Sequence, residues 1–394
     1  MKHNWAYKKL GDICSFERGV TYSKEDESDT SSDVIILRSN NIDLETYSLN
    51  FLDLKYLNND FQIKASKKLR ANTILICISN GSLCHLGKTA FVDRDYDMAF
   101  GGFMGLIIPN SQNPKYLSYV FRSPLYYKFL DSLNRGANIR NIQFTKLSKL
   151  LIPIPPIAVQ EQIVAELDKI NETIEDCREL LCNLDALKLS LFYDYFGDPN
   201  TNPKNWNIST FGEIGTFIRG GGFLKRDFVD FGIPCIHYGQ IHTKFGEVVR
   251  KNLTYISEYT ALKSKFAKPN DVILAITSED LEGSCKSVAW LGDFEVAVGG
   301  HAAIFTHNQN PVFISFYTRS NAFCIEKEKY AHGSKVVEIR PKDIEKIPIY
   351  LPPLELQEKF AERIEQIEAQ KKTVENTIAE LQTLLDSRMD YWFN

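Results

Sequence analysis

The same helix start occurs twice in this chain, 197 residues apart, and this repeat limits the fold more than any other feature. The first copy reads IPPIAVQEQIVAELDKI over 154–170, and the second reads LPPLELQEKFAERIEQI over 351–367. In each copy a proline pair holds the preceding residue extended and suits the first helical turn. Apolar residues then recur at helical spacing. The sequence therefore predicts two long helices that begin in the same way.

A heptad pattern runs along both predicted helices. Seventeen of twenty a and d positions are apolar over about five repeats, which favours a coiled-coil seam over a globular surface helix. The first set is Ile163, Leu167, Ile170, Ile174, Cys177, Leu181, Leu184, Lys188, Leu191 and Tyr195. The second set is Phe360, Ile364, Ile367, Lys371, Val374, Ile378, Leu381, Leu385, Arg388 and Trp392. The simplest way to bury both seams is for the second helix to run back antiparallel along the first.

The segments before the two helices are also copies of each other. LGDICSFERG (10–19) aligns with FGEIGTFIRG (211–220), and AFGG (99–102) aligns with AVGG (297–300). GANIRNIQFTKLSKLLIP (136–153) likewise aligns with GSKVVEIRPKDIEKIPIY (333–350). Trp5 matches Trp206, and we expect both to be core residues. Buried strand-like runs alternate with short helices in both copies, so each should be a mixed α/β domain.

The predicted fold class is therefore α+β, with two homologous globular domains, two long helices packed as an antiparallel coiled coil, and an internal pseudo-two-fold axis. The predicted order along the chain is a domain over 1–153, a helix over 154–198, a domain over 199–350 and a helix over 351–394. The loops differ most between the copies, for example SNGSLCHLGK (79–88) against TSEDLEGSCK (277–286). A shared frame with divergent loops indicates two related ligands that are recognised differently.

Charge separates the domains from the helices. Residues 1–156 carry a net charge of +5 and residues 199–353 carry +2, whereas 157–198 carry −7 and 354–394 carry −4. The overall net charge of −4 would argue against nucleic acid, but the segments that could touch it are not acidic. The acidic residues fall mostly outside the seam, which indicates a solvated helix face.

Catalytic motifs do not occur. The chain has no GxGxxG, P-loop, HExxH or GxSxG pattern and no Pro-Asp dipeptide, and its histidines and eight cysteines lack ligand spacing. NPKY (113–116) comes closest to the adenine-methylating signature Asn-Pro-Pro-Tyr, but its third residue is lysine and no cofactor glycine loop accompanies it. The absence of an apolar leader or of 18 consecutive apolar residues, with scattered thiols, predicts a cytoplasmic protein.

Taken together, the proline-pair helix starts, the duplicated domains, the N-terminal "W…LGDI" and the RGANI and HGSKVVEI segments resemble the specificity subunit of Type I restriction–modification enzymes. The resemblance covers essentially the whole chain. It implies a non-catalytic subunit in phage defence, whose two target recognition domains each read one half of a bipartite DNA site. It also implies that the helices set the spacing and dock two methyltransferase subunits, with motor–nuclease subunits joining for cleavage. S-adenosylmethionine, ATP and Mg are expected on those partners, and no cofactor or metal on this chain.

Polar loop residues are the candidate DNA contacts, because base edges are read by polar side chains and phosphates by Lys and Arg. In the first domain they are Arg38, Asn40, Asn41, Asn80, Lys88, Arg135, Asn138, Arg140 and Asn141. In the second domain they are Tyr238, Gln240, Ser278, Lys286, Ser334, Lys335 and Arg340. The alternatives are a specificity subunit of a related restriction or phage-defence system, a coiled-coil scaffold whose domains bind protein, and an enzyme with an unrecognised site.

Overall fold

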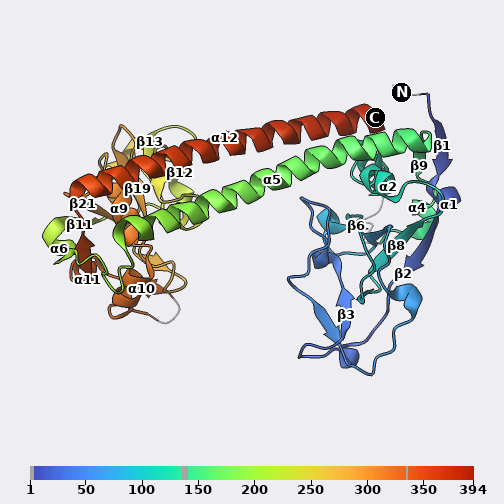
Figure 1. Ribbon diagram of the computed structural model, residues 1–394, viewed down its shortest axis with the longest axis horizontal. Coiled ribbons are helices and arrows are strands. Elements are labelled where there is room, and N and C mark those ends of the chain that lie inside the picture. The colour runs from blue at the N-terminus through green and yellow to red at the C-terminus, as the bar shows by residue number, and fades with distance from the viewer. Residues whose placement is uncertain (1–3, 135–140, 334–335) are drawn as a thin grey trace. The chain divides into compact units, whose positions relative to one another are not determined.

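The computed structural model describes residues 4–134, 141–333 and 336–394. The chain divides into two compact units, and each is described by itself: unit 1 comprises 1–178 with 376–394, and unit 2 comprises 179–375. Two 40-residue helices, α5 (Ile157–Phe196) and α12 (Leu354–Phe393), each begin in one unit and end in the other (Figure 1). We call the part of unit 1 before α5 head one, and the part of unit 2 between α5 and α12 head two.

Head one contains an antiparallel sheet of four strands in the order β2-β8-β5-β6 and a smaller sheet in the order β4-β3-β7. The strands of the first sheet are Cys14–Arg18, Met104–Pro109, Thr73–Cys77 and Thr89–Val92, in that order. Those of the second are Lys55–Leu57, Val34–Leu37 and Ala99–Phe100. The first strand of the chain, β1 (Ala6–Lys9), pairs antiparallel with the last strand of the head, β9 (Leu151–Ile154). This pairing closes the head where α5 begins.

Head two repeats this plan with additional edge strands. Its larger sheets have the orders β11-β21-β17-β19-β14 and β12-β15-β13-β20-β16. The first sheet consists of Gly215–Arg219, Ala302–His307, Val272–Ala275, Lys286–Trp290 and Val248–Val249. The second consists of Phe228–Val229, Thr254–Ile256, Ile233–Ile236, Val296–Val298 and Lys265–Ala267. Two smaller pairs join β10 (Asn207–Thr210) to β23 (Pro348–Leu351) and β18 (Thr277–Ser278) to β22 (Val337–Glu338).

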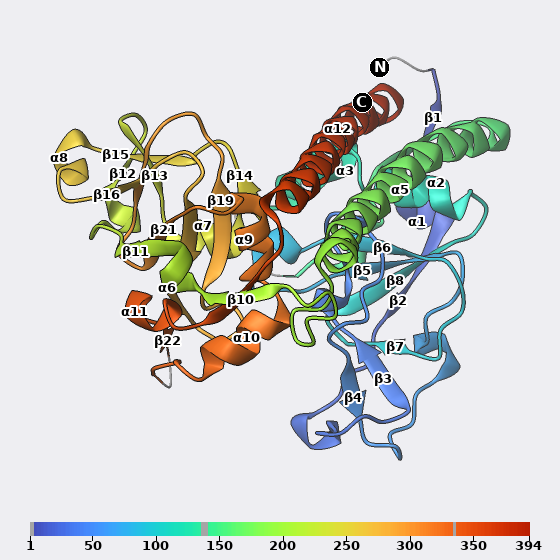
Figure 2. The ribbon, with the colours of Figure 1, turned by 60° about the vertical axis from the view of Figure 1, so that its left-hand side comes forward.

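The short α-helices of head one have counterparts at matching places in head two. In head one they are α1 (Leu10–Ile13), α2 (Pro114–Val120), α3 (Pro124–Asn134) and α4 (Phe144–Leu147). In head two the short helices are α6 (Phe211–Ile214), α7 (Tyr238–Thr243), α8 (Glu258–Ala261), α9 (Pro311–Tyr317), α10 (Asn321–Glu328) and α11 (Pro341–Ile344). Among the described residues, α7 and α8 have no α-helical counterpart in head one. Helix α9 lies beside β19 (Figure 2). The mixed α/β domain predicted from each copy is confirmed.

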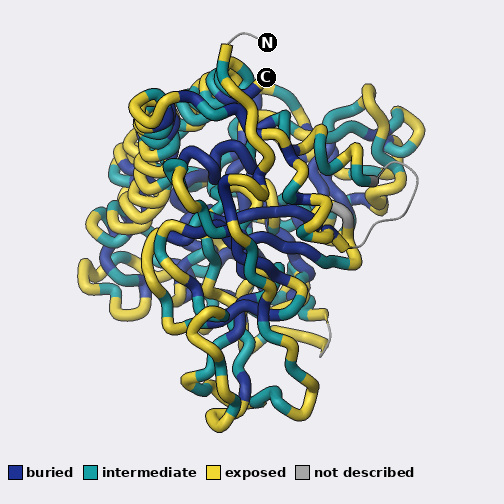
Figure 3. Tube along the Cα trace, turned by 90° about the vertical axis from the view of Figure 1, so that its right-hand side faces the viewer, coloured by how far each residue is buried: buried dark blue, intermediate teal, exposed yellow. Residues whose placement is uncertain are grey.

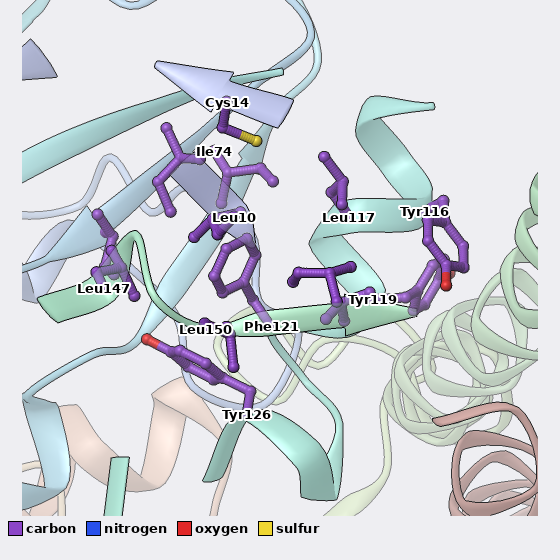
Figure 4. Close-up of a cluster of buried hydrophobic side chains, with 14 of the residues drawn as sticks. Leu10, Cys14, Ile74, Tyr116, Leu117, Tyr119, Phe121, Tyr126, Leu147 and Leu150 are labelled. Carbon is purple, nitrogen blue, oxygen red and sulfur yellow. The ribbon is translucent and has the colours of Figure 1, made fainter. Parts of the chain in front are cut away.

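The main core of head one is assembled from distant parts of its sequence. Leu10 of α1, Ile74 of β5, Leu117 of α2 and Leu147 of α4 meet in one buried cluster (Figure 4). Phe121 packs its ring edge-on against Tyr126 at 5.0 Å between centroids. The strands at the centre of head one are buried and the loops between them are exposed (Figure 3). Because strands are buried and loops are exposed, loop residues are the ones able to reach a ligand.

The ends of both long helices complete the head cores. In unit 1, Ile163 near the start of α5 and Phe393 at the end of α12 belong to the same buried cluster. In unit 2, Phe360 near the start of α12 and Phe196 at the end of α5 do the same, with ring centroids 5.1 Å apart. Each head is therefore finished by the start of the helix that follows it and by the last turns of the other helix.

Contacts between the two helices have an antiparallel register. In unit 1, Glu166 of α5 forms an ion pair with Arg388 of α12. In unit 2, Lys188 of α5 pairs with Glu368 of α12 at 2.7 Å. Partner numbers thus fall along α12 as they rise along α5. All twenty predicted seam positions are buried or half-buried, as the heptad assignment requires.

The three charged seam residues are all held by carboxylates. Lys188 keeps only 4% of its side chain exposed and contacts Asp185 at 2.9 Å and Glu247 of head two at 2.7 Å, besides Glu368. Burial would lower the pKa of the Lys188 ammonium, but Glu247 and hydrogen bonds to all three carboxylates outweigh burial and raise that pKa. Lys371 pairs with Asp185 at 2.5 Å. The interruptions of the heptad are therefore ion pairs that fix helix register.

A buried glutamine locks each helix start to its head. Gln160 accepts a hydrogen bond from the backbone N–H of Asn113 at 3.0 Å and donates to Gln112 Oε1 and Pro155 O. Gln357 repeats all three bonds in unit 2, with Asn310, Gln309 and Pro352. This explains why the glutamine recurs after both proline pairs.

Asn113 explains the NPKY tetrapeptide. Its side chain accepts hydrogen bonds from the backbone N–H groups of Lys115 and Tyr116, so it is the N-cap of α2, with Pro114 in the first turn. Asn310 caps α9 in the same way in head two. An Asn-Pro helix start therefore occurs in both heads, as NPKY (113–116) in head one and NPVF (310–313) in head two.

The paired tryptophans depart from the sequence-based expectation, because both are half-buried rather than core residues. The ring of Trp5 stacks on Trp392 at 6.1 Å, beside the end of α12. Trp206 Nε1 donates to the carbonyl of Phe196, the last residue of α5. Each tryptophan thus holds the C-terminal end of a long helix. None of the helices within 4–134, 141–333 and 336–394 combines the length and apolar content needed to cross a bilayer.

Candidate nucleic-acid interface

The frame of the candidate interface is the same in both heads. Arg18 Nε donates to the carbonyl of Gly102 at 3.2 Å, and Arg219 Nε donates to the carbonyl of Gly300 at 2.8 Å. A Cβ on Gly19 would lie 2.0 Å from a backbone oxygen of the facing segment, so only glycine fits there. The repeated FxRG and AxGG segments therefore bind each other and fix the base of the loops.

A backbone bridge then brings the divergent loops together. In head one, Ser79 and Asn141 form an antiparallel bridge, and Ile142 N donates to Ile78 O at 2.7 Å. In head two, β18 and β22 pair Ser278 with Val337. The loop after β5 thus lies beside the segment before α4, and the equivalent segments meet in head two. These are the stretches in which most of the candidate residues lie.

Three candidates in head one contact the polar side chains of Asp53 and Ser39. Arg38 Nη2 contacts the Asp53 carboxylate at 3.1 Å, and the Asn40 side chain donates to the same carboxylate. The Asn80 side chain donates to Ser39 Oγ at 3.0 Å. Asn40 is exposed and the side chain of Arg38 is 38% exposed, so both remain accessible to a ligand.

Two other candidates in head one are buried. Asn41 accepts from the backbone N–H of Arg38 and donates to the carbonyls of Asn50 and Asp53, so its side chain supports the loop from within. Lys88 donates to the carbonyl of Ile42 at 3.1 Å, and burial lowers the pKa of its ammonium. In this arrangement neither side chain faces outwards. Asn141, in contrast, is exposed.

Three candidates in head two line a hollow of about 1320 Å³. They are Tyr238, Ser278 and Lys286, and the hollow is also lined by His242 and His301. The Tyr238 ring lies 5.0 Å from the His301 ring and 5.9 Å from the His242 ring. Lys286 donates to the carbonyl of His242, and burial lowers the pKa of its ammonium. Head two therefore presents a polar concave surface lined by aromatic rings.

The remaining described candidates in head two are placed differently. Gln240 accepts from the backbone N–H of His237 and donates to Thr254 Oγ1, which repeats the support given by Asn41 in head one. Arg340 is exposed at the start of α11. The candidates Arg135, Asn138, Arg140, Ser334 and Lys335 lie outside the described residues.

Residues that the sequence analysis did not select also belong to this surface. His301 and Phe103 follow the two repeated glycine pairs, and both are exposed. Their position after AxGG could have identified them, because AxGG repeats in both copies while the next residue changes from phenylalanine to histidine. His242 had no such signal, because it lines the hollow only through the fold of α7. Among the described residues no cluster of His, Cys, Asp and Glu could hold a metal ion.

The family model for the "Type I restriction modification DNA specificity domain" matches residues 2–180 and again residues 203–383. The chain belongs to this family. The two matches cover the two heads, so the internal duplication is a duplication of the family's domain. The chain is thus a specificity subunit with two target recognition domains, and it is a non-catalytic DNA-recognition component.

Curated relatives agree with the family assignment. The chain is 24% identical over 408 residues to the StySPI specificity subunit of Salmonella potsdam, covering 98% of this chain and 87% of the relative. It is 24% identical over 420 residues to the EcoKI specificity subunit of Escherichia coli K12, with 98% and 88% covered.

Solved structures agree on the fold. A chain from a study of assembly and conformational transition of a type I restriction–modification system matches with a TM-score of 0.59. That match has 20% identity and covers 99% of this chain and 97% of the other. The specificity subunit of M. genitalium matches with a TM-score of 0.53 at 14% identity, over 98% of this chain and 95% of the other. The predicted architecture is thereby confirmed at the level of the family fold.

Proposed function

We propose that head one and head two each read one half of a bipartite site in double-stranded DNA, and that α5 and α12 hold the halves at a fixed gap. The observation that carries this proposal is that the FxRG and AxGG segments repeat in both heads while the loop surfaces beside them differ. Arg18 and Arg219 brace equivalent glycine pairs, yet head one presents an asparagine-rich loop and head two a hollow lined by rings. Two faces on one frame suit two different base sequences.

Charge supports a division between reading and docking. The segments that form the heads carry +5 and +2, whereas the helix segments carry −7 and −4. A polyanion is repelled by the helices, so the phosphate contacts belong to the heads. The acidic helix faces suit a partner with a basic surface, which we assign to two methyltransferase subunits. The small positive charge of the heads leaves much of the phosphate grip to those partners.

The remaining components follow from the same assignment. S-adenosylmethionine belongs to the methyltransferase subunits, and ATP and Mg belong to motor–nuclease subunits that join for cleavage. The complex would act in the cytoplasm, where its DNA substrate is found.

Exchange of one head tests the proposal. Residues 1–153 are replaced by the equivalent residues of a relative with a different target, and adenine methylation is mapped by single-molecule sequencing in cells that supply the methyltransferase subunits. The expected result is that one half of the methylated sequence changes while the other half and the gap stay the same. Exchange of 199–350 is the matched control and should change the opposite half. A change in the whole site, or no change in either exchange, would refute separate reading.

A further inference from the structure

Phe103 is an exposed aromatic residue on a rigid turn of head one. The residue is 70% exposed. Its carbonyl accepts hydrogen bonds from the backbone N–H groups of Ile78 at 2.9 Å and Ser79 at 3.1 Å. Met104 N donates to Gly101 O, which closes the turn around it. The backbone is therefore fixed while the ring stays in water, an arrangement that gives the head no apolar burial.

The surroundings of Phe103 distinguish it from an ordinary exposed apolar residue. Its backbone is bonded to the strand end that leads to Asn80, and the bridge between Ser79 and Asn141 starts at the same point. The preceding residue is Gly102, whose carbonyl is held by Arg18. The backbone of Phe103 thus lies beside polar loop residues of the candidate interface, next to a residue that has no side chain, and the residue is exposed. Phe231, 89% exposed, stands elsewhere, before β13 of head two.

The equivalent residue of head two points to a role in discrimination. His301 occupies the same place after the glycine pair, and its carbonyl accepts from Ile276 N at 3.0 Å as the carbonyl of Phe103 accepts from Ile78 N. The frame is retained and the ring changes from one that cannot hydrogen-bond to one that can. A requirement of the fold would act on both positions alike, whereas a requirement of the ligand acts on each separately.

We propose that Phe103 contacts the C5-methyl group of a thymine in the half-site of head one. This inference rests on the proposed function. The thymine methyl is the apolar group that base pairs present in the major groove, and phenylalanine is one of the side chains that meet it by apolar contact. A phenyl ring provides neither a hydrogen bond to another base edge nor a charge for phosphate. Head one therefore requires a thymine at one position, and head two has no equivalent apolar requirement at His301.

Substitution of thymine by deoxyuridine isolates this contact, because it removes the methyl group and keeps base pairing. The full chain, assembled with its methyltransferase subunits, is titrated with duplexes of its mapped target in which one thymine at a time is replaced. We expect a loss of about fourfold at one thymine of the head-one half-site, the fold-change that about 0.8 kcal/mol for one buried methyl-sized group gives. Salt is held constant throughout, since phosphate contacts depend on it.

Variants then assign the contact. Phe103→Ala and Phe103→His should bind the thymine and deoxyuridine duplexes equally at that position. Phe231→Ala removes a ring of the same size from head two and should keep the fourfold difference in affinity between the thymine and deoxyuridine duplexes. Thermal unfolding checks that each variant is folded.

Several results would overturn the inference. They are a head-one half-site that has no thymine, a wild-type complex indifferent to deoxyuridine at every position, and a fourfold difference that persists in Phe103→Ala. A loss of affinity in Phe103→Ala that is equal for thymine and deoxyuridine would also overturn it, because the ring would then act on the duplex without reading the methyl group. These results leave separate half-site reading intact. A wild-type complex that does not prefer its mapped target over a scrambled duplex would refute the proposed function itself.

Discussion

Replacing Lys188 by methionine should destabilise head two together with the helix ends packed on it. The Lys188 side chain is 4% exposed, and its ammonium lies within 2.9 Å of three carboxylates. Methionine keeps most of the stem volume and removes the charge. Glu247 is then left 20% exposed with Arg319 at 3.5 Å as its remaining ion-pair partner among the described residues.

The expected loss is about 2 kcal/mol in the free energy of unfolding. Removing one partner of a fully buried ion pair costs about 3–5 kcal/mol. The loss here is smaller because Glu368 and Asp185 keep 37% and 53% of their side chains exposed and can be solvated. For a unit of about 200 residues, a loss of this size lowers the melting temperature by roughly 4–8 °C. Calorimetry measures the shift, and hydrogen exchange should localise it to 179–375.

The dependence on pH has a defined direction. Burial would raise the pKa of the Glu247 carboxyl, but Arg319 and Lys188 outweigh burial and lower that pKa below 4.5. A carboxylate with a lowered pKa stabilises the folded state above its unfolded pKa, and this contribution is lost as pH falls through the folded value. The difference between wild type and Lys188→Met should therefore be full at pH 7 and shrink below pH 4.5.

Two further variants make the test specific. Lys359→Met removes an ion pair whose side chains are 59% and 78% exposed, so it should leave the melting temperature nearly unchanged, because exposed ion pairs contribute little to stability. Adding Glu247→Gln to Lys188→Met should not recover the loss, because it takes from the buried Arg319 guanidinium its carboxylate partner among the described residues. The reasoning would be refuted if Lys188→Met were as stable as wild type, or no less stable than Lys359→Met.

Two other predictions concern the junctions between helices and heads. Gln160→Ala should lower the free energy of unfolding by about 1–3 kcal/mol, because buried hydrogen-bond partners are left unpaired, and should speed hydrogen exchange at the start of α5. Gln162 is exposed, so Gln162→Ala should change neither quantity. Equal effects of the two variants would show that Gln160 does not hold the helix start to head one. Phe393→Ala should lower the free energy of unfolding of unit 1, measured in urea, by about 3–5 kcal/mol, because the ring is buried in the head-one core. Leu384 is 45% exposed, so Leu384→Ala should cost far less. Equal losses would show that α12 does not complete head one.

The sequence was sufficient to predict features that depend on periodicity or local order. The a and d assignment located the buried face of both helices because a heptad repeat fixes side-chain direction over many turns. Alignment of the copies also located the frame, since FxRG and AxGG recur in each. The hydrogen bond between Asn113 and Gln160 was not predicted, although both residues recur in the second copy, because they lie 47 residues apart in sequence.

The candidate site was harder to predict because its geometry depends on long-range contacts. Arg38 and Asn40 were chosen as polar loop residues, but their shared partner Asp53 lies 15 residues beyond Arg38 and 13 beyond Asn40. Asn41 has the same composition signal as Asn40 and is nevertheless buried. Phe103 was missed because polarity was the criterion, whereas the structure bonds the backbone of this exposed apolar residue to the strand end that leads into the polar loop.

If two heads read separate half-sites at a gap set by the helices, lengthening both helices should lengthen that gap. Seven residues are inserted into α5 between Arg178 and Glu179 and into α12 between Glu375 and Asn376, where each helix passes from one compact unit to the other. The contacts within each unit are then retained. Seven residues add about 10.5 Å of helix.

Adenine methylation mapping gives the result. We expect a gap that is longer by about one to three base pairs, with both half-sites unchanged. The upper value follows from dividing the added helix length by about 3.4 Å per base pair. Insertion into α5 alone is the control and should abolish methylation, because the two seams no longer match. An unchanged gap in the double insertion, or new bases in either half-site, would contradict the account.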